Sequence, residues 1–405
     1  MELSKPNKSF HHIFTPLRDL LNDSRTTGVL LVFCTILSLV LTNSSGSGWF
    51  NKFWNNEIPT GIFSSLRLPG SPISWINNFG MAFFFVLAAT EIKRELLSGE
   101  LSQFKKAILP FGAAFGGMMM PALIFIGFNF FSSYSHGWGI PTATDIAFSI
   151  AAASLLGKRF PVGLKILLLA IAIIDDLGAI VVIALFYGGH INWIALLISG
   201  VIYGLLLLCN RMKMKFGLIQ MILGLLMWYA MLQSGVEASI TGVLFAFAMP
   251  VNSLALIEKF IHKSVNFFIL PVFAIANTAI LLPSHVVDSL TTSVGMGIFL
   301  GLVVGKPLGI FLACRIMVGM NIASLPSNVN WKQVFGMGTL AGIGFTMSIF
   351  TTMLAFTDTA VQDIAKISIL TAVVGSVIVS YFYFRAIYAK KINPGTLPQT
   401  ETSFG

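Results

Sequence analysis

Charged side chains are scarce in this sequence: Lys, Arg, Asp and Glu together make up 10% of its 405 residues. A soluble domain carries about 25% charged residues, because its surface must face water. Apolar segments recur from Thr27 to Ala386, many of them near the length of about 18–20 residues that crosses a bilayer. We therefore exclude a soluble globular protein and expect one transmembrane domain, residues 27–388, between polar segments 1–26 and 389–405.

Cysteine is also rare, since Cys34, Cys209 and Cys314 are the only three in the chain. Their spacing matches neither a metal site nor a disulfide framework, and each lies in or beside an apolar segment. We interpret them as side chains that face lipid or the protein core. No cofactor is expected.

The charges that are present are distributed unevenly along the chain. A net charge of +9 is compatible with a nucleic-acid partner. If the first apolar segment runs outward, however, 20 of the 25 Lys and Arg residues fall in inner loops, and only Lys52 and Arg67 fall in outer loops. This asymmetry follows the positive-inside rule and predicts that both termini are cytoplasmic. The basic loops then face anionic lipid, and no nucleic-acid partner is expected.

Twelve apolar segments are expected to cross the membrane as helices. They are residues 27–43, 77–97, 107–130, 138–156, 162–187, 192–209, 217–233, 237–250, 265–283, 293–318, 334–354 and 366–388. The predicted fold class is an all-α integral membrane protein with about twelve transmembrane helices. The outer stretch 43–75 is the one long segment between these spans.

Two of the predicted spans contain helix breakers. The fourth holds Gly139 and Pro141 just before Asp145, and the eleventh holds four glycines: Gly336, Gly338, Gly342 and Gly344. Close packing of glycine-rich helices would explain the eleventh span equally well if it stood alone. Broken helices at corresponding positions of two halves, spans 3–5 and 10–12, instead predict an inverted-repeat transporter with its site at the midplane.

Two adjacent carboxylates, Asp175 and Asp176, stand in the middle of the fifth predicted span. Ionisable groups inside a membrane are costly, so they mark functional sites by default. Neighbouring helix positions point about 100° apart, so the two side chains face different partners. Because two ionised carboxylates repel in a low dielectric, the pair favours binding of protons or of a hard cation such as sodium or lithium.

Three other residues are candidates for balancing charge around this pair. Lys306 is the one cation deep in the tenth span, and it either pairs with an intramembrane aspartate or snorkels toward a helix end. Asp145 lies where the fourth span breaks, and its charge suits the positive ends of two half-helices. Lys306 would balance the two negative ends. Thr144 either supplies an oxygen ligand or caps a half-helix.

Several glutamates lie at predicted inner helix ends. Glu91 and Glu95 are one turn apart, and Glu258 precedes Lys259 and His262. An ordinary charged helix end explains each group as well as a cation entrance or a pH-sensing funnel does.

Taken together, the motifs resemble one known family. They are Glu91-Ile92-Lys93-Arg94-Glu95-Leu96, Thr144-Asp145-Ile146-Ala147-Phe148, Ile174-Asp175-Asp176-Leu177-Gly178, Gly305-Lys306-Pro307-Leu308-Gly309 and Gly342-Ile343-Gly344-Phe345-Thr346-Met347-Ser348. From the first span to the twelfth, the sequence is similar to the bacterial sodium/proton antiporter family A. The resemblance implies a multi-pass protein of the bacterial inner membrane that expels sodium or lithium in exchange for two protons.

The resemblance also implies roles for individual residues. Asp175 and Asp176 would bind the cation and the protons transiently, and Lys306 would partner them. Asp145 and Thr144 would stabilise the crossing of the broken helices. Family members form homodimers, partly through an outer β-hairpin that stretch 43–75 would supply.

Two positions depart from the family pattern, which has histidine where this chain has Glu237 and Lys259. Both positions are associated with pH response in the family. A solvated glutamate has a pKa of about 4.3, so Glu237, at the outer start of a span, is expected to stay ionised from about pH 6 to 9. We therefore expect the Asp175/Asp176 pair, where protons compete with the cation, to set the pH profile.

Other transport and enzyme classes were weighed against this interpretation. Intramembrane aspartyl proteases use Tyr-Asp and Gly-x-Gly-Asp, and this chain contains no Tyr-Asp or Gly-Asp pair. A channel suits paired titratable carboxylates less well than an exchanger does. A proton-coupled symporter for organic solutes remains open, and it would need a larger pocket.

Overall fold

A computed structural model of the chain describes residues 24–44, 48–57, 61, 66–189, 191–214, 216–283, 285–326 and 328–389. Within these ranges the protein is entirely helical and contains no strand. The predicted polar segments 1–26 and 389–405 lie almost wholly outside the described residues.

Six helices correspond directly to predicted spans. They are α2 (Ser24–Asn43), α7 (Phe104–Asn129), α9 (Val162–Phe186), α10 (Trp193–Arg211), α11 (Leu218–Ser234) and α20 (Thr359–Ala389). The short helices of the described chain are α3 (Gly48–Asn55), α12 (Ile240–Ala248), α15 (Val286–Thr291), and the 3₁₀ turns η2 (Glu100–Ser102) and η4 (Gly157–Arg159).

Three further spans each contain one turn of π-helix. They are α5–η1–α6 (Pro72–Trp75, Ile76–Gly80, Met81–Ser98), α13–η5–α14 (Val251–Ser264, Val265–Ile269, Leu270–Asn277) and α16–η6–α17 (Ser293–Leu300, Gly301–Gly305, Lys306–Gly319). In the second and third, a proline follows the π turn by two residues: Pro271 and Pro307. Proline has no N–H to donate to the carbonyl four residues earlier, and its ring clashes with that carbonyl in an α-helix. A wider π turn just before the proline relieves this clash.

Two spans are broken, as predicted. The 3₁₀-helix η3 (Ser135–Thr142) precedes α8 (Ile146–Leu155), and α18 (Trp331–Ala341) precedes α19 (Phe345–Ala355) with a bend of 49°. In the described chain, eight helices are long and apolar enough to span a membrane, and the bent pair makes a ninth. The remaining three predicted spans are shorter: η3 with α8, α11 and α12.

The ninth predicted span was wrong in its start. The helix begins at Val251 rather than at residue 265, and it ends at Asn277. Four polar residues, Glu258, Lys259, His262 and Lys263, reduce the hydropathy of its first half. Leu254, Ile257 and Ile261 nevertheless bury one face of that half, so the helix continues through the charged stretch.

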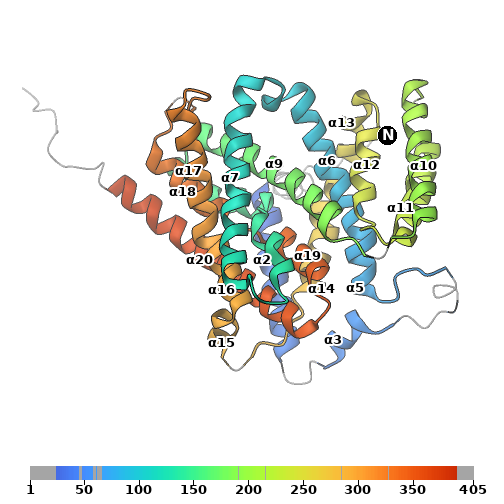
Figure 1. The fold of residues 1–405 in the computed structure, drawn as a ribbon, viewed down its shortest axis with the longest axis horizontal. Helices are drawn as coiled ribbons and strands as arrows, with labels where there is room; N and C mark the ends of the chain where they lie inside the picture. Colours follow the sequence, from blue (N-terminus) through green and yellow to red (C-terminus); the bar gives the residue numbers. More distant parts are fainter. Residues whose placement is uncertain are drawn as a thin grey trace, which may run out of the picture.

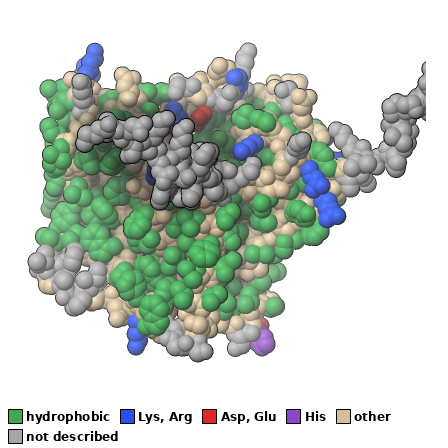
Figure 2. Space-filling view, turned by 180° about the vertical axis from the view of Figure 1, so that it is seen from behind, with side chains coloured by type: hydrophobic (Ala, Val, Ile, Leu, Met, Phe, Trp, Pro, Cys, Tyr) green, Lys and Arg blue, Asp and Glu red, His purple; other side chains and the backbone are tan. Residues whose placement is uncertain are grey.

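The long helices form two groups joined by α9 (Figure 1). Helices α6 and α10–α13 lie together on one side, and α7, α16, α17, α18 and α20 lie on the other, with α9 running obliquely through the middle. On the face shown in Figure 2, hydrophobic side chains form a broad band, and Lys and Arg side chains lie mainly toward its upper edge. Such a surface suits contact with lipid.

The β-hairpin that the resemblance implies for the outer stretch 43–75 is not seen among its described residues, which contain the helix α3 and no strand. Residues 45–47, 58–60 and 62–65 of this stretch lie outside the description. Phe50 and Trp54 bury one face of α3, whereas Trp49 and Phe53 are exposed. Phe50 and Trp54 pack against Ala276, and this contact stabilises the helix. A hairpin formed by the same residues would lose this contact.

Close packing of α7 on α17 depends on glycine. A Cβ added to Gly309 would lie 2.1 Å from the backbone oxygen of Gly116, and one added to Gly116 would lie 2.5 Å from that of Gly309. Small residues of this kind let membrane helices approach to backbone contact. This close contact fixes the position of α17 along α7, and therefore the position of Lys306 at the start of α17.

Candidate functional site

The breaks in the two interrupted spans cross each other inside the protein. Residues 143–145 separate η3 from α8, and residues 342–344 separate α18 from α19. Asp145 N donates to Ile343 O at 2.6 Å, which joins the two breaks backbone to backbone. A break exposes N–H groups at the start of one half-helix and C=O groups at the end of the other, and all of them need partners.

One carboxylate satisfies N–H groups of both half-helices that start at the crossing. Asp145 Oδ1 accepts from Phe148 N of α8 at 3.0 Å. Asp145 Oδ2 accepts from Thr346 N at 3.1 Å and from Thr346 Oγ1 at 2.6 Å, at the start of α19. The negative charge thus lies against two positive helix ends, as predicted for Asp145.

Lys306 and Thr144 contact Asp175 near the C-terminal, negative ends of the other two half-helices, η3 and α18. Lys306 Nζ lies 2.7 Å from Asp175 Oδ2 and also donates to Thr142 O, the last carbonyl of η3. Thr144 Oγ1 lies 2.6 Å from the same Asp175 oxygen and 2.9 Å from Ala341 O, at the end of α18. Lys306 therefore contacts one negative helix end, and the hydroxyl of Thr144 reaches the other.

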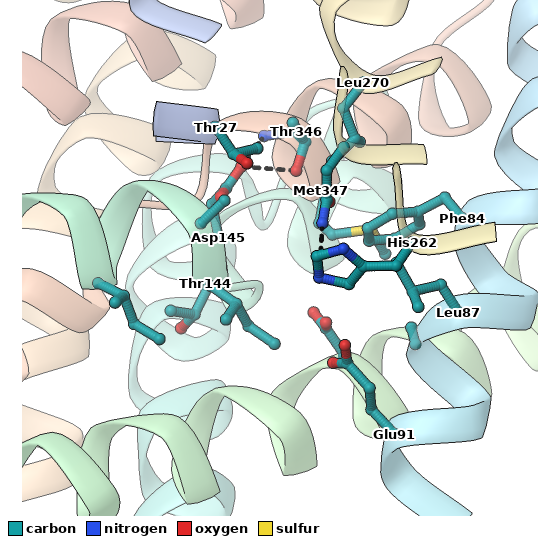
Figure 3. A pocket seen from close by; sticks show the side chains of 16 residues that line it. Thr27, Phe84, Leu87, Glu91, Thr144, Asp145, His262, Leu270, Thr346 and Met347 are labelled. Atoms are coloured by element: carbon teal, nitrogen blue, oxygen red, sulfur yellow. Dashed lines mark hydrogen bonds between the residues drawn. The ribbon is translucent and has the colours of Figure 1, made fainter. Parts of the chain in front are cut away.

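A pocket of about 130 Å³ opens beside this crossing (Figure 3). Its lining comes from α2, α6, the 143–145 break, α8, α9, α13–η5–α14 and α19. The polar side chains among the lining residues are Thr27, Glu91, Thr144, Asp145, Asp176, His262, Asn266 and Thr346. In Figure 3, Asp145 and Thr346 lie on one side of the pocket, and Glu91 and His262 reach into it from the other.

The two adjacent aspartates have different environments. Asp175 does not line the pocket, and the ammonium group of Lys306 compensates the charge of its carboxylate. Asp176 lines the pocket, and no hydrogen bond reaches its Oδ1 from any described residue. Oδ1 of Asp175 is likewise without a donor among the described residues. The site thus presents oxygen atoms with lone pairs still available, which is what a proton or a hard cation requires.

The structure separates the glutamates that were grouped in the sequence. Glu91 lines the pocket, whereas Glu95 and Glu258 do not. Glu258, on α13, forms an ion pair with Arg94 of α6, and both side chains are partly exposed. A partly exposed pair of this kind contributes little to stability.

Comparison with known proteins decides the family. The model of the Na+/H+ antiporter 1 family matches residues 18–384. The chain belongs to this family.

Relatives named as antiporters cover almost the whole chain. A protein of Flavobacterium psychrophilum named Na(+)/H(+) antiporter NhaA is 44% identical over 382 residues, which are 93% of this chain and 97% of the relative. Its namesake from Dechloromonas aromatica is 43% identical over 383 residues, 92% and 94% of the two chains. The NhaA 2 antiporter of Clostridium beijerinckii is 39% identical over 388 residues, 92% and 96%.

Membership of the Na+/H+ antiporter 1 family confirms the resemblance found in the motifs. Together with the apolar spanning helices, it shows a multi-pass membrane transport protein rather than an enzyme.

Inspection of the sequence gave no role to several pocket residues of this antiporter. Thr27 and Asn266 were overlooked, and Thr346 appeared only as part of a motif. Asn266 Nδ2 and His262 Nε2 are 3.0 Å apart and form a hydrogen bond within one helix turn. The missed start of α13 explains part of this, because a helix that begins at Val251 carries both residues on one face. Thr27 gives no signal in sequence, since threonine is common in membrane helices.

Glu237 is less solvated than the sequence suggested. It lies between α11 and α12, outside the spanning helices and outside the pocket lining. Burial raises the pKa of its carboxyl, and a hydrogen bond from the backbone N–H of Ser239 opposes that rise. Partial burial therefore moves the pKa of this carboxyl above the solvated value that the sequence suggested.

Glu237→Gln is expected to stabilise the protein at high pH only. Because the folded-state pKa is raised, wild-type stability falls as pH rises from about 4.3, the unfolded value, through the folded-state pKa, and the penalty is complete above it. The variant lacks this penalty, so its melting temperature should match wild type near pH 4 and exceed it by about 2 °C at pH 8.

Melting curves of the detergent-solubilised proteins at both pH values test this expectation. A gain that is equal at pH 4 and pH 8 would contradict it. The activity midpoint should stay within one pH unit of wild type at saturating sodium, because Glu237 does not line the pocket.

Proposed function

We propose that this protein is a secondary active transporter that exports sodium or lithium from the cytoplasm in exchange for protons. It would reside in the bacterial inner membrane with both termini cytoplasmic, and it would contribute to sodium and pH homeostasis. The observation that carries the proposal is the placement of Asp176 in the pocket, with an unpartnered oxygen, beside an Asp175 that is already paired with Lys306.

This arrangement supports exchange by competition. A cation that enters the pocket meets the oxygens of Asp176 and of the Thr144 hydroxyl, which line it, and its positive charge replaces that of bound protons. Asp175, one residue away and paired with Lys306, adds negative charge close to the same pocket. When protons bind the carboxylates instead, the cation loses its ligands and leaves. Raising the sodium concentration should consequently move the activity midpoint to lower pH.

The size of the pocket argues against a symporter for organic solutes. Sites for such molecules usually occupy about 300–1,000 Å³, whereas this pocket measures about 130 Å³. A small cation with a few waters fits that volume.

Additional proposals concern the surroundings of the site. Glu91 would line the inner entrance for the cation, and Glu95 and Glu258 would contribute to pH response at the same end. The protein would form a homodimer in the lipid membrane, as the resemblance implies. Chemical cross-linking in native membranes would give only monomer bands if that were wrong.

The test of the function uses everted membrane vesicles that contain a pH-sensitive dye. Respiration acidifies the vesicles and quenches the dye, and added sodium or lithium should restore its fluorescence as protons leave in exchange. Potassium serves as the comparison cation. Equal recovery with all three salts would refute a site selective for small hard cations, and no recovery with any would refute exchange.

Exchange is expected to be electrogenic. If two protons enter for each sodium ion that leaves, net positive charge moves inward in every cycle. In proteoliposomes, sodium export should then accelerate when an inside-negative potential is imposed with potassium and valinomycin. A flux that ignores the potential would indicate one-for-one exchange.

A further inference from the structure

We infer that Tyr187 is a positioning residue that holds η3 as the closure of the cation site on the side opposite the pocket. The inference rests on the proposed function for its meaning in transport. Tyr187 is the C-cap of α9, the helix that carries Asp175 and Asp176, and its side chain is buried. No motif in the sequence singled it out.

The hydroxyl of Tyr187 bridges two backbone groups of η3. It accepts from Gly139 N at 3.0 Å and donates to His136 O at 2.8 Å. These groups are three residues apart, which is the pair that a 3₁₀ turn joins directly. The phenol therefore connects α9 to the hydrogen-bonding ladder of η3 itself, and does so with both its donor and its acceptor capacity.

Packing around the hydroxyl is specific to this contact. A Cβ added to Gly139 would lie 2.7 Å from the hydroxyl oxygen, so only glycine permits the approach. The rings of His136 and Tyr187 meet edge to face at 5.0 Å, and Trp138 meets Phe186 in the same way at 5.2 Å. The end of α9 thus contacts η3 along its first half.

The second half of η3 belongs to the cation site. Thr142 O accepts the hydrogen bond from Lys306, and Ile140 O accepts one from Ser348 Oγ at 2.7 Å. Thr142 is three residues beyond Gly139, about 6 Å along a 3₁₀-helix at about 2 Å per residue. A rigid connection over that distance makes the position of the Lys306 partner depend on the anchor at Tyr187.

The location of the pocket shows what η3 closes. The pocket is lined by the break and by three residues of α8, Ile146, Ala147 and Ile150, whereas no residue of η3 lines it. Because α8 and η3 leave the crossing in opposite directions along one span, η3 blocks the site on the side where the pocket does not open. Alternating access requires that this side open in another state, and the Tyr187 bridge must then break or move.

Tyr187→Phe removes the bridge and keeps the ring. Loss of the bridge, whose two hydrogen bonds stabilise the pocket-open state, should shift the balance toward the opposite state by about two- to tenfold. The apparent KM for sodium, measured on the pocket side, should rise by a smaller factor, because it scales with the inverse of the fraction of molecules that present the pocket to that side. The maximal rate should change less.

A labelling experiment reports the closure without any transport. Ile140 is fully buried in η3, and Ile140→Cys provides a thiol there. An impermeant maleimide, added from the side opposite the pocket, should label it about two- to tenfold faster in the Tyr187→Phe background than in the Tyr187 background. The matched control is Tyr229→Phe, which removes a hydroxyl that donates to Leu66 O elsewhere in the protein.

Gly139→Ala is the second variant, since its methyl group must displace the hydroxyl although the phenol remains. We expect it to raise labelling and KM in the same direction. Folded Tyr187→Phe and Gly139→Ala proteins with wild-type labelling rates and KM would overturn the inference. Faster labelling in a protein without sodium-dependent exchange would instead refute the proposed function and leave the positioning role intact.

Discussion

Asp176→Asn is expected to abolish sodium-dependent proton exchange while the protein still folds. Asp176 lines the pocket, and its Oδ1 has no hydrogen-bond donor among the described residues. An amide of nearly the same shape keeps the packing of α9 but can neither take up a proton nor carry the negative charge that a cation needs. Dye dequenching should fall to the level of vesicles without the transporter. We expect the same loss of exchange for Asp175→Asn.

The matched control for this prediction is Asp363→Asn. Asp363 lies near the start of the long helix α20 and does not line the pocket. It should retain most of its exchange activity. Near-normal sodium-dependent dequenching in Asp176→Asn, with wild-type amounts in the membrane, would show that the cation binds elsewhere.

Lys306→Met is expected to destabilise the fold by about 3–5 kcal/mol, the range seen when one partner of a buried ion pair is removed. Lys306 and Asp175 are both 0% exposed, and their charged atoms are 2.7 Å apart. Without the ammonium group, the Asp175 carboxylate lacks its counter-charge and Thr142 O loses its donor. Unfolding in a mixed-detergent titration with a denaturing surfactant should therefore begin at much lower surfactant fraction.

The double variant Asp175→Asn with Lys306→Met separates lost charge balance from lost packing. It removes both charges, so most of the stability lost in Lys306→Met should return, although exchange stays absent. Lys332→Met serves as the control, because Lys332 is exposed and its loss should change stability by less than about 0.5 kcal/mol. A double variant that is no more stable than Lys306→Met would mean that Asp175 is not its partner.

Both predictions depend on residues that the sequence had already singled out. Ionisable groups in long apolar segments are few, so Asp145, Asp175, Asp176 and Lys306 were conspicuous without any structure. The helix breakers of the fourth span likewise predicted an interruption before the helix that Asp145 caps. Glu91 was ambiguous because an inner helix end looks the same whether it faces water or a pocket.

Sequence alone did not predict the pocket residues contributed by distant helices. Asn266 comes from a helix whose first half is too polar to stand out as a span, and Thr27 comes from a helix without any distinctive residue. The partly buried state of Glu237 was missed for a related reason. Burial is set by what packs against a residue, and those contacts involve residues far away in the chain.

The sequence by itself determined the fold class, the family and the intramembrane charges, because hydrophobic length and the scarcity of charge act locally along the chain. Only the tertiary structure decided that Asp175 is paired and Asp176 is available, although the two are neighbours. The physical reason is that adjacent helix positions point in directions about 100° apart. Lys306 reaches one of them from α17, and the pocket between α6, α8, α13 and α19 reaches the other.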